Sequence, residues 1–178
     1  VGVVEKKLLL TKDKVKKNDI VLAVPSSGLH SNGYSLVRHI IKKKKLPLKI
    51  KKELLKPTKI YVKEIISLNK RKLVNGCANI TGGGLLNNLI RVIPKNLSLN
   101  INLDKIRTTK IFKWLKKNNI NDDEMLSTFN CGVGFCLIIN KKNINKVKKI
   151  FSKKYEPYQI GFISKGGKKV NTYGELQW

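Results

Sequence analysis

A loop rich in serine and glycine, between residues 24 and 38, holds the side chains best suited to bind an anion. It follows an apolar run at 20–24 and precedes an apolar pattern with helical spacing at 36–41, so the expected order is strand, loop and helix. Hydroxyl groups and the unpaired N–H groups of a helix's first turn bind phosphate well, and glycines let a ligand approach the backbone. An ordinary helix N-cap has the same composition, so this alternative stays open. The candidate phosphate-binding or substrate-binding residues here are Ser26, Ser27, Gly28, Ser31 and Gly33.

His30 lies in the same loop, at a position where neither an apolar core nor helical spacing requires a histidine. Its ordinary pKa of about 6.5 would let it donate to phosphate or transfer a proton. His39 lies within the predicted helix and is interpreted as a surface or packing residue. Two histidines do not form a metal site, and we predict no metal ligands in the chain.

Three consecutive glycines form a second loop of the same kind. They follow an apolar segment that ends at Ile80 and precede a helical pattern that begins at Leu85. Because glycine loses more backbone entropy on ordering than other residues, three together indicate a close approach, with a flexible turn as the alternative. Two such loops favour phosphate chemistry, although neither matches the P-loop or dinucleotide pattern. The candidate phosphate-binding residues here are Thr81, Gly82, Gly83 and Gly84.

The formal net charge of +27 raises the question of nucleic-acid binding. Only four of the 38 basic residues are arginine, and no aromatic residues alternate with the lysines as stacking platforms. The 34 lysines, 20 isoleucines and 18 asparagines all have A/T-rich codons, so a compositional bias of the genome explains the charge. We expect no specific nucleic-acid partner, only weak and salt-sensitive association with polyanions.

Three cysteines and one acidic group have alternative interpretations. The cysteines show no metal-binding spacing and are expected to be structural thiols in a reducing compartment; Cys131 could be a nucleophile but has no obvious base beside it in sequence. Asp122, Asp123 and Glu124 could bind Mg²⁺ or act as bases. An acidic first turn of a short helix that ends at Thr128 is the preferred interpretation.

The remaining pattern predicts strands and helices that alternate without a regular βαβ series. Strands are expected at 1–10, 20–24, 73–80, 97–103, 132–139, 158–164 and 170–173. Helices are expected at 33–44, 57–69, 84–93, 109–117 and 143–152. This order favours an α+β fold with a mixed β-sheet covered by helices rather than a Rossmann unit. No apolar run approaches the roughly 20 residues of a membrane span, so we expect a cytoplasmic protein with no membrane partner.

Four ordered motifs resemble the C-terminal half of the phosphoribosylformylglycinamidine cyclo-ligase family, also called aminoimidazole ribonucleotide synthetases, of purine biosynthesis. They are Ser-Ser-Gly-Leu-His-Ser-Asn-Gly-Tyr-Ser-Leu-Val-Arg at 26–38, Leu-Lys-Pro-Thr-Lys-Ile-Tyr-Val-Lys at 55–63, Ile-Thr-Gly-Gly-Gly at 80–84 and Thr-Phe-Asn-Cys-Gly-Val-Gly at 128–134. The resemblance extends from Val1 to about Ile163. It implies a sheet layered as α/β/α and an enzyme that uses ATP and Mg²⁺ to close formylglycinamidine ribonucleotide into aminoimidazole ribonucleotide, releasing ADP and phosphate.

The resemblance also implies roles for particular residues and for a part of the protein outside this chain. His30, Asn32 and Asn130 would be catalytic, and the two glycine loops would hold phosphate. Residues 1–10 would end a missing N-terminal domain, and residues 11–178 would form the C-terminal domain. The N-terminal domain would supply much of the nucleotide and metal site and the main contacts of a homodimer. The chain alone is therefore expected to be inactive.

Three positions depart from the family's usual residues. Asn79 stands where His is common, Asn87 where Glu is common, and Ser127 where Arg is common. These losses would weaken acid–base and phosphate chemistry. Two alternatives therefore stay open: another ATP-dependent member of the superfamily, such as formylglycinamidine synthetase, thiamine-phosphate kinase or selenophosphate synthetase, or a noncatalytic interaction domain.

Overall fold

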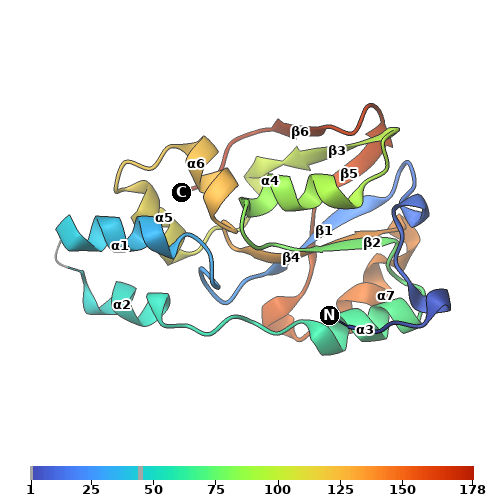
Figure 1. The fold of residues 1–178 in the computed structure, drawn as a ribbon, viewed down its shortest axis with the longest axis horizontal. Helices are drawn as coiled ribbons and strands as arrows, with labels where there is room; N and C mark the ends of the chain where they lie inside the picture. Colours follow the sequence, from blue (N-terminus) through green and yellow to red (C-terminus); the bar gives the residue numbers. More distant parts are fainter. Residues whose placement is uncertain (1, 44–45) are drawn as a thin grey trace.

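The fold is built on a six-stranded sheet, seen in a computed structural model that describes residues 2–43 and 46–178. The strand order is β2-β4-β1-β5-β3-β6 (Figure 1). Neighbouring strands are antiparallel except β3 and β6, which are parallel. The predicted mixed sheet is therefore confirmed. The strands are β1 (Ile20–Pro25), β2 (Gly76–Asn79), β3 (Leu97–Asn102), β4 (Val133–Ile139), β5 (Tyr158–Lys165) and β6 (Val170–Tyr173).

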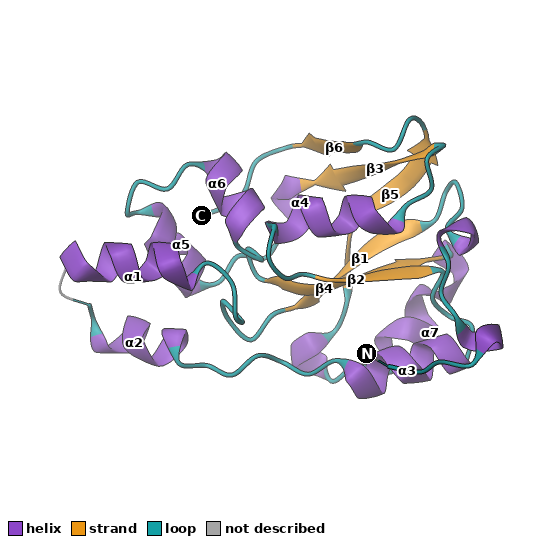
Figure 2. Ribbon diagram, viewed as in Figure 1, coloured by secondary structure: helices purple, strands orange, loops and turns teal. Residues whose placement is uncertain are grey.

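Helices cover both faces of the sheet and one of its ends. In Figures 1 and 2, α4 lies on one side of the sheet and α3 and α7 lie on the other, while α1, α2, α5 and α6 gather beyond one end. This arrangement confirms the predicted α/β/α layering. The helices are α1 (Tyr34–Lys43), α2 (Leu48–Leu54), α3 (Val62–Lys70), α4 (Gly84–Leu89), α5 (Lys110–Lys116), α6 (Asp122–Thr128) and α7 (Ile144–Lys148).

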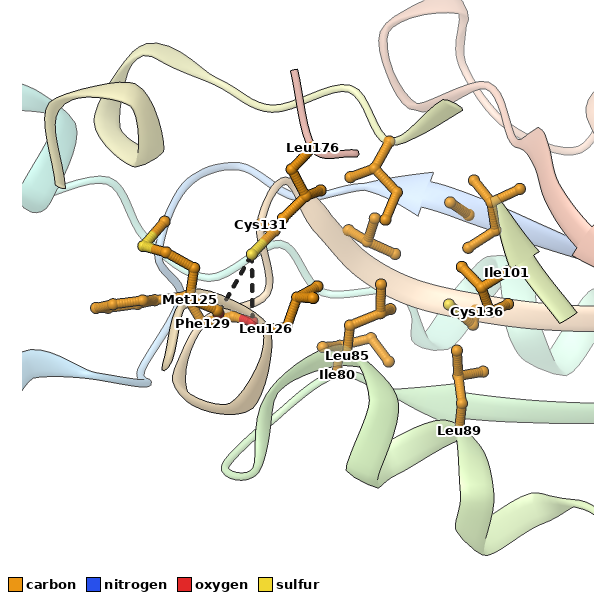
Figure 3. Packing of buried hydrophobic residues seen from close by; sticks show 14 of the residues in the cluster. Ile80, Leu85, Leu89, Ile101, Met125, Leu126, Phe129, Cys131, Cys136 and Leu176 are labelled. Atoms are coloured by element: carbon orange, nitrogen blue, oxygen red, sulfur yellow. Dashed lines mark hydrogen bonds between the residues drawn. The ribbon is translucent and has the colours of Figure 1, made fainter. Parts of the chain in front are cut away.

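The central strand β1 explains why the core has two halves. Val21 and Ala23 point into one apolar cluster, and Leu22 and Val24 point into the other; none of the four is exposed. Successive side chains of a strand face opposite sides of the sheet, so a continuous apolar run is what a strand covered on both faces needs. Figure 3 shows part of the larger cluster, with Leu85 and Leu89 of α4 packed near the sheet.

The register of β4 places both glycine-containing loops at one end of the sheet. Strands β1 and β2 are both antiparallel to β4 and flank it. Pro25 at the end of β1 pairs with Val133, and Asn79 at the end of β2 pairs with Phe135. The loops that follow β1 and β2 therefore both leave the sheet beside the first residues of β4.

One predicted element is wrong, and another is confirmed only in its later part. The expected strand at 1–10 is absent from residues 2–10, where Lys6–Leu8 form a 3₁₀ turn and Val3 and Val4 are exposed. Valine favours strands only where a neighbouring strand can pair with it, and none lies there. The helix expected at 57–69 begins only at Val62, because the backbone before it forms hydrogen bonds with distant residues instead.

One further helix was missed, and another is shorter than predicted. Helix α2 was not predicted at all, and α7 has only five residues where ten were expected. The predicted end of the first helix at Lys44 lies outside the described residues. Among the residues that the structure describes, no helix is long and apolar enough to cross a membrane.

Candidate active site at the end of the sheet

The first loop is closed by a hydrogen bond within it. His30 is only 6% exposed and has a φ of 57°, and its Nε2 accepts a hydrogen bond from the Ser27 backbone N–H at 3.2 Å. Burial lowers the pKa of His30, because the charged ring would lose its hydration. The imidazole is therefore held neutral, with Nε2 as an acceptor.

Ser27 ties this loop to the extended segment before α3. Its Oγ donates to the Pro57 carbonyl at 2.7 Å and accepts from the Lys59 N–H at 3.1 Å. Two residues further on, the Tyr61 hydroxyl donates to the Pro25 carbonyl at 2.8 Å. The single hydroxyl proton of Ser27 is thus already engaged, so Ser27 holds the first loop against residues 57–59.

Asn130 links the loop to the start of β4. It is 1% exposed; its Nδ2 donates to the Gly28 carbonyl, and its Oδ1 accepts from the Gly132 N–H, both at 2.9 Å. Both polar atoms of the amide therefore hold backbone groups. The structure gives Asn130 a positioning role between two glycines that are distant in sequence.

The triple-glycine loop has different requirements at each glycine. Gly83 and Gly84 have φ of 94° and 65°, and a Cβ at Gly84 would overlap the Leu126 carbonyl of α6. A Cβ at Gly82 would meet no atom within 4 Å. Packing and backbone conformation thus explain two of the three glycines, whereas Gly82 keeps an open backbone that a ligand can approach.

Asn88 positions the glycine loop, a role that sequence reasoning missed. It is 5% exposed, and its Nδ2 donates to the carbonyls of Thr81, Gly82 and Gly84 at 3.1, 3.3 and 2.7 Å. Its Oδ1 accepts from Arg91 Nη1 at 3.4 Å. An asparagine four residues after a glycine run, one helical turn on, is the signal that could have identified it.

The two loops meet the same stretch of chain, residues 126–134. The Ile80 N–H donates to the Gly134 carbonyl at 3.1 Å, and a Cβ at Gly134 would overlap His30 and Tyr61. Within the same stretch, the Phe129 ring packs against Gly33 of the first loop. In Figure 3, Ile80 and Leu85 from the glycine segment lie near Leu126 and Cys131.

Some of the predicted site residues line one cavity, some line a second, and the others line neither. The first, of about 850 Å³, is lined by His30, Ser31 and Gly33, and also by Glu124 and Thr128 of α6. The second, of about 590 Å³, is lined by Ser26 and Ser27. Seven further candidates line neither of these two cavities: Gly28, Asn32, Thr81, Gly82, Gly83, Gly84 and Asn130.

The acidic group forms the first turn of α6, as preferred from the sequence. The Asn121 side chain accepts from the Glu124 N–H at 2.8 Å, and Asp122 pairs with Lys116 and accepts from Trp178 Nε1 at 3.0 Å. Within residues 2–43 and 46–178, no three His, Cys, Asp or Glu side chains gather closely enough to hold a metal ion.

Cys131 is a structural thiol. It is fully buried, and burial raises its pKa to about 12. Its Sγ donates to the Met125 carbonyl at 3.3 Å (Figure 3). A thiol that stays protonated near neutral pH is a poor nucleophile, so the burial argues against a catalytic role.

The three positions at which the resemblance implies a different residue all lie around the glycine loop. Asn79 ends β2 two residues before Thr81, and Asn87 lies beside Gly83. The backbone of Ser127 is next to Gly84. All three side chains belong to exposed residues. These three residues thus affect the exposed surroundings of the loop and are not part of the core.

His30 should make the stability of the protein depend on pH. Its folded-state pKa lies below its unfolded value, so its neutral form favours folding above the unfolded pKa, and this contribution is lost as pH falls toward the folded value. Urea unfolding at about pH 7.5 and about pH 5.5 should therefore show a smaller acid-induced loss in His30→Asn than in the wild type. Asparagine tolerates the left-handed φ of this position. The control His39→Asn, at an exposed histidine, should behave like the wild type; equal losses in all three proteins would contradict the prediction.

A family model and the curated relatives agree on a single family. The family described as "AIR synthase related protein, C-terminal domain" matches residues 16–173. A phosphoribosylformylglycinamidine cyclo-ligase from Fusobacterium nucleatum is 44% identical over 177 residues, which cover 93% of this chain and 52% of that protein. The one from Alkaliphilus oremlandii is 39% identical over 183 residues, covering 96% and 53%. The chain thus spans about half the length of the curated relatives it matches.

Solved structures share the fold at low sequence identity. Thiamine-monophosphate kinase from Stenotrophomonas maltophilia K279a has a TM-score of 0.66 at 15% identity, over 98% of this chain and 56% of that chain. T. maritima PurL complexed with ATP has a TM-score of 0.57 at 13% identity, over 99% of this chain and 27% of that one. At such identities the likeness concerns the fold alone. Because the family match extends over nearly the whole described sheet and its helices, the chain belongs to the AIR synthase related family and has the fold of its C-terminal domain.

Proposed function

We propose that this chain is the C-terminal domain of an ATP-dependent cyclo-ligase that converts formylglycinamidine ribonucleotide to aminoimidazole ribonucleotide in de novo purine biosynthesis, with ADP and phosphate as products. The observation that carries the proposal is the 39–44% identity to curated phosphoribosylformylglycinamidine cyclo-ligases over 93–96% of the chain. The kinase likeness, at 15% identity, gives no comparable support for the alternative activities.

The glycine loop fits the phosphate groups that such an enzyme must hold. Gly82 leaves its backbone open, and the Asn88 amide engages carbonyl oxygens of the loop. A guanidinium nitrogen of Arg91 lies 3.9 Å from the position of a Cβ on Gly83. Backbone N–H groups and a nearby guanidinium are what phosphate oxygens need. ATP would supply the phosphoryl group that activates the amide oxygen of the substrate.

The first loop would position the substrate. His30, held neutral with its Nε2 engaged, would act through its remaining ring nitrogen, and Asn32 would contribute an amide at the loop's half-buried edge. Mg²⁺ would be held largely by residues outside this chain, which by resemblance belong to the N-terminal half. We also propose a homodimer for the complete protein and a location in the cytoplasm.

The proposal is tested by joining this chain to the N-terminal half of the Fusobacterium nucleatum relative and measuring ADP release. Release should require formylglycinamidine ribonucleotide, and the joined protein should be inactive with thiamine monophosphate or with formylglycinamide ribonucleotide plus glutamine. The 178-residue chain alone should release no ADP. The N-terminal half joined to its own C-terminal half is the positive control. ADP release that depends on thiamine monophosphate instead would replace the cyclo-ligase assignment, and activity with none of the substrates would favour a noncatalytic domain.

A further inference from the structure

The His30 ring keeps one nitrogen that the protein does not engage. Nε2 accepts from the Ser27 N–H at 3.2 Å, and a neutral imidazole carries its proton on the other nitrogen, here Nδ1. Within residues 2–43 and 46–178, Nδ1 has no hydrogen-bond partner, and the fully enclosed polar atoms that lack a partner there are Ser26 Oγ and Thr109 Oγ1. Nδ1 is therefore accessible. Since His30 lines the cavity of about 850 Å³, this N–H is a donor available to a ligand.

The Tyr61 ring lies beside this imidazole and is itself held firmly. Tyr61 is 5% exposed, its ring centroid is 6.2 Å from that of His30, and the two planes are inclined at 55°. Its hydroxyl donates to the Pro25 carbonyl at 2.8 Å, and its ring packs against Phe135 with the centroids 5.3 Å apart. Moving this ring away from His30 would break these contacts, so Tyr61 restricts the rotation of the imidazole.

Gly134 of β4 provides the space in which the two rings meet. A Cβ there would lie 2.6 Å from His30 Cε1 and 2.9 Å from Tyr61 Cζ, and it would overlap the Tyr61 hydroxyl. The φ of Gly134 is not in the left-handed region, so the backbone conformation does not require a glycine. The packing of His30 and Tyr61 therefore explains the glycine at this position.

We infer that Tyr61 is a positioning residue, which holds the His30 imidazole in one orientation so that Nδ1–H donates to an oxygen atom of the ligand in the large cavity. The identity of that ligand, the ribonucleotide substrate, rests on the proposed function. Its carbonyl, hydroxyl and phosphate oxygens can all accept a hydrogen bond from a neutral N–H. Tyr61 does not line this cavity and its hydroxyl is engaged, so it acts only through His30.

The tautomer of His30 in the 178-residue chain tests this inference without any catalytic activity. Proton–nitrogen NMR correlation at about pH 7.5 shows which ring nitrogen carries the proton. His39→Asn identifies the signals of His30. The wild type should show one tautomer, with the proton on Nδ1. Tyr61→Leu should give a mixture of both tautomers because the ring can rotate, whereas Tyr61→Phe keeps the aromatic ring and should keep the single tautomer.

Tyr155→Leu is the matched control for Tyr61→Leu. The Lys59 ammonium lies 5.2 Å from the Tyr61 ring centroid and 5.1 Å from that of Tyr155, but only Tyr61 pairs with the imidazole. The control should therefore keep the wild-type tautomer. A proton on Nε2 in the wild type would overturn the inference, and that measurement needs no variant to fold. A wild-type tautomer in folded Tyr61→Leu, or the same mixture in Tyr155→Leu, would also overturn it.

Activity separates this inference from the proposed function. In the protein joined to the N-terminal half of the Fusobacterium nucleatum relative, Tyr61→Leu should lower kcat/KM for formylglycinamidine ribonucleotide about tenfold, as expected for one lost hydrogen bond. Tyr61→Phe should keep the wild-type value. An active wild type with undiminished activity in Tyr61→Leu would contradict the positioning role. If the joined wild type releases no ADP, the proposed function fails, and the tautomer alone decides the role of Tyr61.

Discussion

Gly84→Ala should lower the free energy of unfolding by about 3 kcal/mol or more, because two penalties add at this position. An alanine would have to keep a φ of 65°, which disfavours any residue with a Cβ, and its methyl group would overlap the Leu126 carbonyl. Backbone is on the other side of the contact, so α4 and α6 would have to move apart. Urea denaturation followed by circular dichroism measures the loss.

Gly82→Ala is the matched control for this substitution. It lies two residues away in the same loop, and its new methyl group would meet no atom within 4 Å. We expect a change in unfolding free energy of less than about 0.5 kcal/mol. Similar destabilisation by both alanines would mean that any added Cβ in this loop is unfavourable. The contact between Gly84 and α6 would then not explain the loss of stability in Gly84→Ala.

Asn130→Ala should destabilise the protein by about 2–4 kcal/mol. The substitution leaves the Gly28 carbonyl and the Gly132 N–H without their hydrogen-bond partners in a buried region, where water does not replace them. The first loop should also become more mobile, since Asn130 fixes its middle. Urea unfolding measures the first effect, and faster hydrogen exchange of the Ser27 amide, which is hydrogen-bonded within that loop, measures the second.

Asn140→Ala provides the comparison for a similar but exposed side chain. Asn140 Oδ1 accepts from the Lys142 N–H at 3.1 Å, and the residue is exposed, so water can replace the lost bond. We expect a cost of less than about 1 kcal/mol. If the two alanines proved equally harmful, the burial of Asn130 would not account for its effect.

The sequence predicted the sheet and both glycine loops well, because these features depend on local patterns. The apolar run of β1 and the glycines at 82–84 can be identified without knowing the rest of the fold. The segment 57–61 could not be predicted in the same way. Proline followed by apolar residues favours a helix there, but Ser27 and Tyr61 hold the backbone extended through hydrogen bonds that span 30 or more residues.

The roles of single side chains in the candidate site were the hardest to predict. Asn130 was expected to be catalytic, and no local signal shows that its partner Gly28 lies 102 residues away. Asn88 was not identified from the sequence, although it follows the glycine run by one helical turn. Its contribution depends on the path of the glycine loop, which folds back over it. The assignment of a catalytic role to His30, Asn32 and Asn130 stays a prediction.

The position of β1 at the centre of the sheet also affects how the chain can fold. Both of its neighbours are distant in sequence: Ile20 pairs with Ile139 on one side and Phe162 on the other. Closing such long loops before any contact forms makes folding slow. During synthesis, β1 must wait for more than a hundred further residues before it can pair, so nascent chains expose a segment prone to aggregate.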